Sequence, residues 1–447
     1  MFLWKKKIPP GQVIIAGFIG VILVGALLLM LPFATKDGGG ASFLDALFTS
    51  VSATCVTGLV RHDTYTYWSV FGQAVILGLI QVGGMGVVTV AVTLSILTGR
   101  RIGLSQRYLM QEAISAPQVG GIVRITGFIF RTALAAEGIG ACLLAIRFCP
   151  QYGVAAGLWY AVFHSISAFC NAGFDLMGRD MQYASLTAYA GDPLVSVVIA
   201  LLIVVGGIGF FVWDDIWTHG FRVRRYRLQT KLALAMTGFL LVVPGIVLFL
   251  FEFGRDVWGF DSAGERLLAA LFQTVTPRTA GFNTVDLTLA SEPMVLLMIL
   301  LMLVGGSPSS TAGGMKTTTA AAMLLSIRAV FNGKDSICCF GRRIPQTALR
   351  QAVSIFSLYL MLFLAGGSLI CALEDIPLKA ALFETASAIG TVGLSLGITD
   401  SLGSGSCLIL IGLMFFGRVG GLTMLYAVVG NHTAAPYQMP KENITVG

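Results

Sequence analysis

One short pattern recurs four times along this chain, at intervals of about 110 residues. Each copy begins with Ala, then Leu or Val, then Phe. It continues through mostly small and hydroxylated residues and ends at a glycine. The copies span residues 46–58, 161–173, 270–281 and 381–393. Because such a repeat indicates one structural unit used several times, the fold must contain four similar units.

Each copy lies between two long apolar segments. Hydrophobic residues make up 56% of the chain and charged residues 11%, against about 25% charged in soluble proteins. The segments are long enough to cross a hydrocarbon core about 30 Å thick, at residues 12–34, 70–98, 122–148, 194–217, 232–253, 293–327, 351–373 and 406–430. The sequence therefore predicts an all-α membrane protein with eight transmembrane helices in one membrane domain, 1–447. We name its tandem repeats the first to fourth units, at about 9–100, 118–220, 228–330 and 348–435.

The basic residues gather in four clusters at the ends of apolar segments. They are Lys5, Lys6 and Lys7, then Arg100, Arg101 and Arg107, then Arg222, Arg224, Arg225, Arg227 and Lys231, and finally Arg328, Lys334, Arg342, Arg343 and Arg350. Since cytoplasmic loops carry an excess of Lys and Arg, these clusters predict cytoplasmic N and C termini, including a cytosolic tail at 436–447, in the plasma (inner) membrane. Orientation explains the net charge of +7, so the expected surroundings are lipid and not nucleic acid.

The segment before each closing glycine is helical in character but only about half as long as a membrane span. It must enter the membrane and return. Non-helical backbone at membrane depth is tolerated only where it is buried in protein or lines a water-filled cavity. Four such loops predict span–pore helix–span units arranged with pseudo-fourfold symmetry around one central pore.

The loop that closes each copy suits a selectivity filter. Glycine can turn successive carbonyls toward an axis, and rings of carbonyl oxygens replace the hydration shell of K⁺. We expect K⁺ to bind backbone carbonyls near Gly58, Gly173, Gly281 and Gly393. The candidate filter residues are Thr54, Cys55, Val56, Thr57, Gly58, Cys170, Asn171, Ala172, Gly173, Arg278, Thr279, Ala280, Gly281, Gly390, Thr391, Val392 and Gly393. Small residues in membrane helices also mark close packing, but fourfold repetition favours the filter.

A glycine pair stands in each second span, at Gly83-Gly84, Gly206-Gly207, Gly305-Gly306 and Gly420-Gly421. Such pairs disfavour a continuous helix, although close packing alone also explains the first two copies. In the third unit the interruption is long and polar, which predicts a flexible loop below the filter; a broken helix packed against its neighbours is the alternative. The candidate gate consists of Gly305, Gly306, Ser307, Pro308, Ser309, Ser310, Thr311, Ala312, Gly313, Gly314, Lys316 and Arg418. Arg418 is costly in an apolar span, so it faces the bundle interior or water, where it opposes cation passage or pairs with a buried carboxylate such as Glu137. Asp175 either concentrates cations at the outer mouth or is a solvated loop carboxylate.

The four filter segments resemble those of the Trk/Ktr/HKT superfamily of K⁺ transporters, over nearly the whole chain. The start just before the first span is most similar to the Ktr-type membrane subunit. The resemblance implies Na⁺-stimulated K⁺ uptake, an intramembrane gating loop at 305–316 and a constriction-site arginine at Arg418. Gly58 stands where a serine favours Na⁺ in the family, which implies K⁺ selectivity, whereas Pro308 replaces a usual small residue.

The same resemblance implies a homodimer and a cytosolic nucleotide-binding (RCK-type) regulatory ring on the basic loops. It implies no covalent cofactor, with K⁺ as the transported ion and Na⁺ as an activator. A second hypothesis is an alternating-access cation symporter, but such carriers often use inverted repeats and these copies all run in the same sense. An enzyme is not expected, because no catalytic set converges in the sequence.

Overall fold

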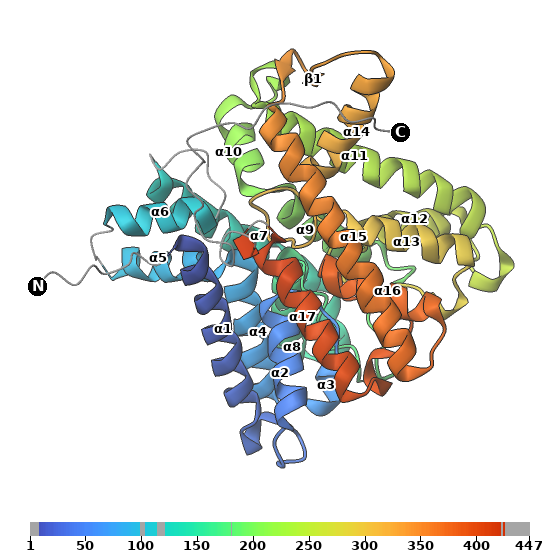
Figure 1. Ribbon diagram of the computed structural model, residues 1–447. Coiled ribbons are helices and arrows are strands. Elements are labelled where there is room, and N and C mark those ends of the chain that lie inside the picture. The colour runs from blue at the N-terminus through green and yellow to red at the C-terminus, as the bar shows by residue number, and fades with distance from the viewer. Residues whose placement is uncertain (1–8, 99–102, 114–120, 180, 422, 425–447) are drawn as a thin grey trace, which may run out of the picture.

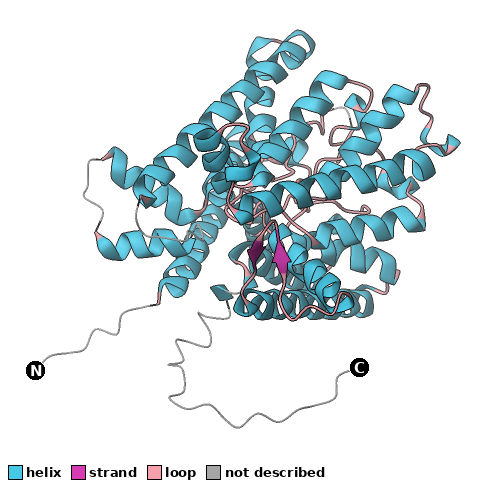
Figure 2. Ribbon diagram, turned by 90° about the horizontal axis from the view of Figure 1, so that it is seen from above, coloured by secondary structure: helices cyan, strands magenta, loops and turns pink. Residues whose placement is uncertain are grey.

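The computed structural model describes residues 9–98, 103–113, 121–179, 181–421 and 423–424. The clusters at Lys5–Lys7 and Arg100–Arg101 and the tail at 436–447 lie outside the described residues. Within them the chain is predominantly helical, with loops between the helices and one two-stranded hairpin (Figures 1 and 2). In this hairpin, β1 (Cys338–Cys339) pairs antiparallel with β2 (Arg342–Arg343).

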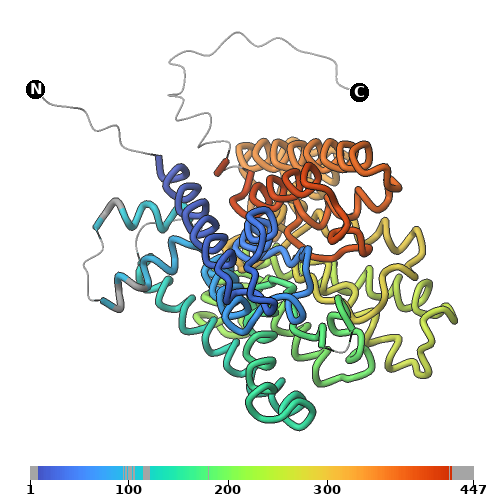
Figure 3. Tube along the Cα trace, turned by 90° about the horizontal axis from the view of Figure 1, so that it is seen from below, coloured from blue at the N-terminus to red at the C-terminus, as the bar shows by residue number. Residues whose placement is uncertain are grey.

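Each unit begins with a long helix followed by a short one. The long helices are α1 (Pro10–Leu29), α7 (Ile122–Tyr152), α11 (Leu228–Val247) and α15 (Gln346–Glu374). The short helices are α2 (Phe43–Thr54), α8 (Val154–Phe169), α12 (Ala263–Val275) and α16 (Leu378–Gly390). Each short helix packs against the long helix before it. In the tube view the colours from blue through green and yellow to red follow one another around the molecule (Figure 3).

The second apolar segment of every unit is interrupted. In the first unit α4 (Val70–Met85) and α5 (Val87–Leu97) are bent by 95°, and in the second α9 (Pro193–Ile208) and α10 (Phe210–His219) by 91°. The third has α13 (Glu292–Leu303), a loop, and α14 (Thr317–Phe331), and the fourth has α17 (Ser404–Val419). The remaining helices are short: η1 (Pro32–Ala34), α3 (Thr64–Tyr67), α6 (Leu104–Ala113), η2 (Thr187–Tyr189), η3 (Val223–Arg225), η4 (Leu248–Glu252), η5 (Asp256–Trp258), η6 (Leu287–Leu289) and η7 (Thr399–Ser401).

Length and composition of the described helices support a membrane location. Four helices are long and apolar enough to cross a membrane, or six if each bent pair counts as one span. Between 28 and 33% of each long apolar window is buried, so most of its surface faces outward. Side chains such as Leu27, Ile139, Ile146 and Met361 are more than three-fifths exposed, as lipid-facing residues are.

Several helices begin at polar capping residues that the sequence places just before the apolar run. Ser42 accepts a hydrogen bond from the Asp45 amide at the start of α2, and Asp192 accepts from Leu194 and Val195 at the start of α9. Such caps satisfy amides that have no partner inside the helix, at about 1 kcal/mol each. The capping residues therefore help to fix where α2 and α9 begin.

Glycines allow the interrupted spans to touch the ends of the short helices. A Cβ at Gly83 of α4 would lie closer than 3.0 Å to the carbonyl oxygen of Thr54, and Gly206 and Gly417 meet Phe169 and Ile389 in the same way. This contact brings the helix interruptions directly beneath the loops that follow the short helices.

We therefore expect Gly83→Ala to destabilise the protein by about 1–3 kcal/mol, because the added methyl group overpacks the contact with Thr54. Thermal unfolding of the purified protein in detergent measures the effect. Gly78→Ala is the matched control, since a Cβ at Gly78 of the same helix meets nothing within 4 Å. Equal unfolding temperatures for the two variants would contradict the close contact.

Candidate functional site

The backbones of the four closing glycines meet in a ring. A Cβ added to any one of them would lie closer than 3.0 Å to a carbonyl oxygen of the next segment. The pairs are Gly58 with Ala172, Gly173 with Ala280, Gly281 with Val392, and Gly393 with Thr57. The last pair returns to the first segment, so the ring is closed. Only glycine fits such contacts, and its φ angles here lie between 71° and 93°.

The same backbone conformation occurs in all four segments. The residue two positions before each glycine also has positive φ, at Val56 (56°), Asn171 (58°), Thr279 (64°) and Thr391 (51°). A left-handed conformation at such residues costs roughly 1–2 kcal/mol each and persists only where the surroundings enforce it. The four segments are therefore built alike at the level of dihedral angles as well as sequence.

Hydroxyl groups of the short helices hold this strained backbone. Ser52 Oγ accepts a hydrogen bond from the Gly58 amide at 3.1 Å, and Ser387 Oγ accepts from the Gly393 amide at 3.0 Å. Ser167 Oγ donates to the Phe174 carbonyl at 2.7 Å, and Thr276 Oγ1 donates to the Phe282 carbonyl at 2.5 Å. Each donor or acceptor is the fourth residue after the phenylalanine of its copy. Our sequence interpretation missed these residues, although a hydroxyl at one fixed position of four repeats was visible.

Several other oxygens near the ring have no protein partner. The hydroxyls of Thr54, Thr57, Thr279 and Thr391 are buried and make no hydrogen bond within the described part of the chain. Buried polar groups usually find a partner, so these oxygens are available to a hard cation. By contrast, the Cys170 sulfur lies against Gln81 and Glu137, and the Arg278 guanidinium donates to Thr237 of α11. Only the backbone of these two residues can serve the ring.

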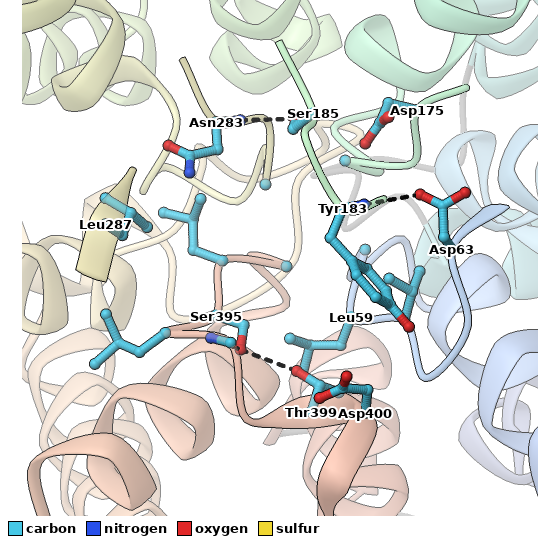
Figure 4. Close-up of a pocket in the computed structure, with 18 of the residues that line it drawn as sticks. Leu59, Asp63, Asp175, Tyr183, Ser185, Asn283, Leu287, Ser395, Thr399 and Asp400 are labelled. Atoms are coloured by element: carbon cyan, nitrogen blue, oxygen red, sulfur yellow. Dashed lines mark hydrogen bonds between the residues drawn. The ribbon is translucent and has the colours of Figure 1, made fainter. Parts of the chain in front are cut away.

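A cavity of about 240 Å³ opens on one side of the ring (Figure 4). The four glycines line it together with Asp63, Asp175, Asp286 and Asp400, one aspartate from each unit. No Lys or Arg is among the described residues that line it. Asp63 also accepts a hydrogen bond from the Tyr183 amide at 3.0 Å, which fixes the loop of the second unit beside that of the first. Four aspartates without a described Lys or Arg favour cations in this cavity. Asp175 lies in its wall, a position that fits both the outer-mouth hypothesis and a loop carboxylate.

On the opposite side of the ring, the polar loop of the third unit is tied to its neighbours. Its ends pair with each other, because the Gly305 amide donates to the Met315 carbonyl at 2.7 Å. Its middle fills the break between α9 and α10, where the Ser307 amide donates to Gly207 at 2.9 Å and the Phe210 amide donates to Ser309 at 2.7 Å. The helix break therefore supplies the backbone groups that this loop needs.

Arg418 joins three units below the ring. Its guanidinium donates to the carbonyls of Thr311, Gly83 and Gly84, the last at 3.0 Å. The alternative that Arg418 pairs with Glu137 is wrong, because the Glu137 carboxylate instead accepts hydrogen bonds from the side-chain Nε2 of Gln81, at 3.1 and 3.2 Å. Lys316 also donates to carbonyls, of Ala312 at 2.9 Å and Gly313 at 3.3 Å.

A second cavity, of about 250 Å³, is lined by Lys316 and Arg418 but by none of the four ring glycines. The first cavity is lined by the four ring glycines but by neither Lys316 nor Arg418. The ring, the loop and Arg418 therefore separate two cavities. This arrangement can select cations at the ring and block them at the loop, as a membrane transport protein requires.

Comparisons with known proteins agree with this class. Residues 10–434 match the family model TrkH, described as a cation transport protein. The chain is 38% identical to the potassium/sodium uptake protein NtpJ of Enterococcus hirae, covering 99% of this chain and 98% of that one. It is 40% identical to the Ktr system potassium uptake protein B of Bacillus subtilis, covering 95% and 94%. The chain belongs to the TrkH family of cation transport proteins.

A solved structure supports the fold. The potassium transporter TrkH from Vibrio parahaemolyticus superimposes with a TM-score of 0.74 at 20% sequence identity, over 94% of this chain and 85% of that one. The predicted resemblance to the Trk/Ktr/HKT superfamily is confirmed by the family model and by the two relatives named above. The protein is a cation transporter with a helical membrane fold, and not an enzyme.

Proposed function

We propose that this protein takes up K⁺ across the plasma membrane through one pore. K⁺ enters the acidic cavity, loses its water at the ring formed around Gly58, Gly173, Gly281 and Gly393, and leaves past the loop and Arg418. The closed ring of carbonyl contacts carries this proposal, because stacked carbonyls substitute for the hydration shell of K⁺. The names of the relatives support potassium as the cargo.

In this proposal the four units surround the pore with pseudo-fourfold symmetry, and their eight apolar segments are the membrane spans. Support comes from the recurring order of a long helix, a short helix and an interrupted span. In the same proposal both termini lie in the cytoplasm, and the positive clusters of the sequence support this orientation. The 17 candidate filter residues form the ring and its supports, and residues 305–316 with Arg418 form the gate.

Regulation belongs to the same proposal. The protein works as a homodimer with a cytosolic nucleotide-binding ring of the RCK type, which moves the gate, and Na⁺ stimulates uptake. The term Ktr system in the names of three relatives supports a membrane component with partners. The exposed cluster at Arg222, Arg224 and Arg225 is the kind of surface that such a ring contacts.

The decisive experiment measures radioactive Rb⁺ and Na⁺ influx into liposomes that hold the purified protein, with and without Na⁺ outside. A pore gives Rb⁺ influx that follows the electrochemical gradient of Rb⁺ at every Na⁺ concentration, without a fixed ratio to Na⁺ influx. A fixed Rb⁺ to Na⁺ stoichiometry would instead support the alternating-access symporter. Absence of Rb⁺ flux from both the wild type and the gate variant Arg418→Ala under all conditions would reject the proposed function.

For the filter, Gly58→Ser is expected to lower Rb⁺ influx and to lower the Rb⁺/Na⁺ ratio of the remaining influx about tenfold, because its side chain meets the Ala172 carbonyl and disturbs the ring. Both ions are measured in the same liposomes. Gly38→Ser is the control, since Gly38 also has positive φ (74°) but faces open space. An unchanged ratio in Gly58→Ser would remove this position from the filter.

A further inference from the structure

The loop at 305–316 touches the filter directly. Three of its residues each contact a different filter residue, and each of these filter residues stands two positions before a ring glycine. A Cβ at Gly305 would lie 3.2 Å from Thr279 Cγ2, and one at Gly313 would collide with the Thr391 side chain. Thr311 Oγ1 lies 3.1 Å from Asn171 Oδ1. The gate thus supports the inner end of three filter segments.

Among these contacts only that of Thr311 is a hydrogen bond, since the Thr279 and Thr391 hydroxyls have no partner in the residues the structure describes. Thr311 is fully buried and uses every polar atom. Its amide donates to Gly206 at 3.2 Å, its carbonyl accepts from Arg418, and its hydroxyl is shared between Asn171 and the Phe169 carbonyl at 2.9 Å. The hydroxyl therefore connects the residue held by Arg418 to the second filter segment.

Asn171 also contacts the third filter segment. Its Nδ2 donates to the Arg278 carbonyl at 3.3 Å, and its Oδ1 faces Thr311. The orientation of the amide follows from its neighbours, because a carbonyl can only accept and so requires the NH₂ group. One buried side chain consequently spans two filter segments and the gate.

We propose that Thr311 and Asn171 couple the gate to the filter, so that ion selectivity depends on a residue of the gating loop. With Thr311 in place, Asn171 keeps the second and third segments at a fixed spacing. When the loop leaves, Asn171 loses the partner of its oxygen, and the spacing between the two segments relaxes. Asn171 is a positioning residue for the ring and Thr311 determines its orientation. The inference rests on the proposed function.

The test is Thr311→Val, which keeps the shape of the side chain and removes the hydroxyl. Influx of Rb⁺ and Na⁺ is measured in the same liposomes, so that the ratio is independent of how many molecules are open. We expect the Rb⁺/Na⁺ ratio to fall about three- to tenfold, the factor to which one net hydrogen bond corresponds. Thr311→Ser, which keeps the hydroxyl, is expected to retain the wild-type ratio.

Ser310→Ala is the matched control within the loop. Ser310 Oγ donates only inside the loop, to the Ser307 carbonyl at 2.7 Å, so its loss can change the rate but leaves the ratio unchanged. Asn171→Leu should lower the ratio by itself, and adding Thr311→Val should lower it no further, because the two residues act as one link.

Equal changes of both ion fluxes in Thr311→Val, with the ratio intact, would overturn the coupling while leaving the pore proposal standing. Additive effects of the two substitutions would also overturn it. If Thr311→Val does not fold, Thr311→Ala is measured in the same way against Thr311→Ser. Absence of Rb⁺ flux from both the wild type and Arg418→Ala would instead reject the proposed function.

Discussion

Arg418→Ala is expected to raise Rb⁺ influx at least tenfold in liposomes that contain no regulatory partner. The guanidinium joins the carbonyls of Thr311, Gly83 and Gly84, so its loss frees the loop from the first and fourth units. It also removes a positive charge from the path. Two unit charges about 5 Å apart repel by about 3 kcal/mol at an effective dielectric constant near 20, which is about a hundredfold in rate.

Arg418→Lys separates these two contributions. Lysine keeps the charge but lacks the planar guanidinium that binds the Thr311 carbonyl and the Gly83 and Gly84 carbonyls together. We therefore expect only a small rise in Rb⁺ influx. The control within the loop is Lys316→Met. The Lys316 amine donates only to carbonyls of its own loop, so its loss should raise Rb⁺ influx less than the loss of Arg418 does. If a thermal-unfolding measurement shows that Arg418→Ala is folded and its Rb⁺ influx still equals that of the wild type, Arg418 is not the barrier.

The ring could be predicted from sequence because its information is local and repeated. A glycine follows a short helix in each copy, and the structure brings all four glycines together. The hydroxyls at Ser52, Ser167, Thr276 and Ser387 follow the same rule and could have been found with the same alignment of copies. What the repeat did not indicate is that two of them accept from amides while two donate to carbonyls.

The contacts of the gate could not be predicted in the same way. Arg418 binds carbonyls of Gly83 and Gly84, more than 300 residues earlier in the chain. These carbonyls accept a side chain because glycine interrupts α4, and a break frees backbone groups that an intact helix would use itself. A sequence shows that Arg418 needs a partner but not that a broken backbone supplies it. A carboxylate such as Glu137 is therefore the alternative partner that the sequence offers.

The directions of the interrupted spans are also a property of the packed protein. Glycine pairs predicted breaks in the second spans, and the bends of 95° after α4 and 91° after α9 occur at Gly86 and Gly209, whose φ angles are 85° and 103°. At the second break, Gly209 has φ of 103° and its Cα faces the Pro308 carbonyl. The loop and the bend thus determine each other, and neither is encoded by its own segment alone.

Gly393→Ala should abolish transport, with Rb⁺ influx reduced about a hundredfold or more, because one methyl group displaces a carbonyl of the ring. The methyl would collide with the Thr57 carbonyl and with the Gly58 backbone, at the contact that closes the ring. Either the Thr57 oxygen moves away from the pore or the fourth segment shifts outward. Both changes leave an incomplete set of oxygens, so a dehydrated ion has no compensation for its lost water. Influx into liposomes measures the loss.

Gly397→Ala distinguishes loss of the ring from backbone strain. Gly397 has nearly the same φ (85° against 93°), follows in the same loop and lines the same outer cavity, but a Cβ there meets nothing within 4 Å. Both variants therefore carry a similar cost of left-handed backbone, and only Gly393→Ala crowds a carbonyl. We expect Gly397→Ala to retain influx within about twofold of the wild type, since open space accepts the methyl group. Equal losses in the two variants would mean that strain in the loop, rather than contact between the four segments, explains the need for glycine at the ring.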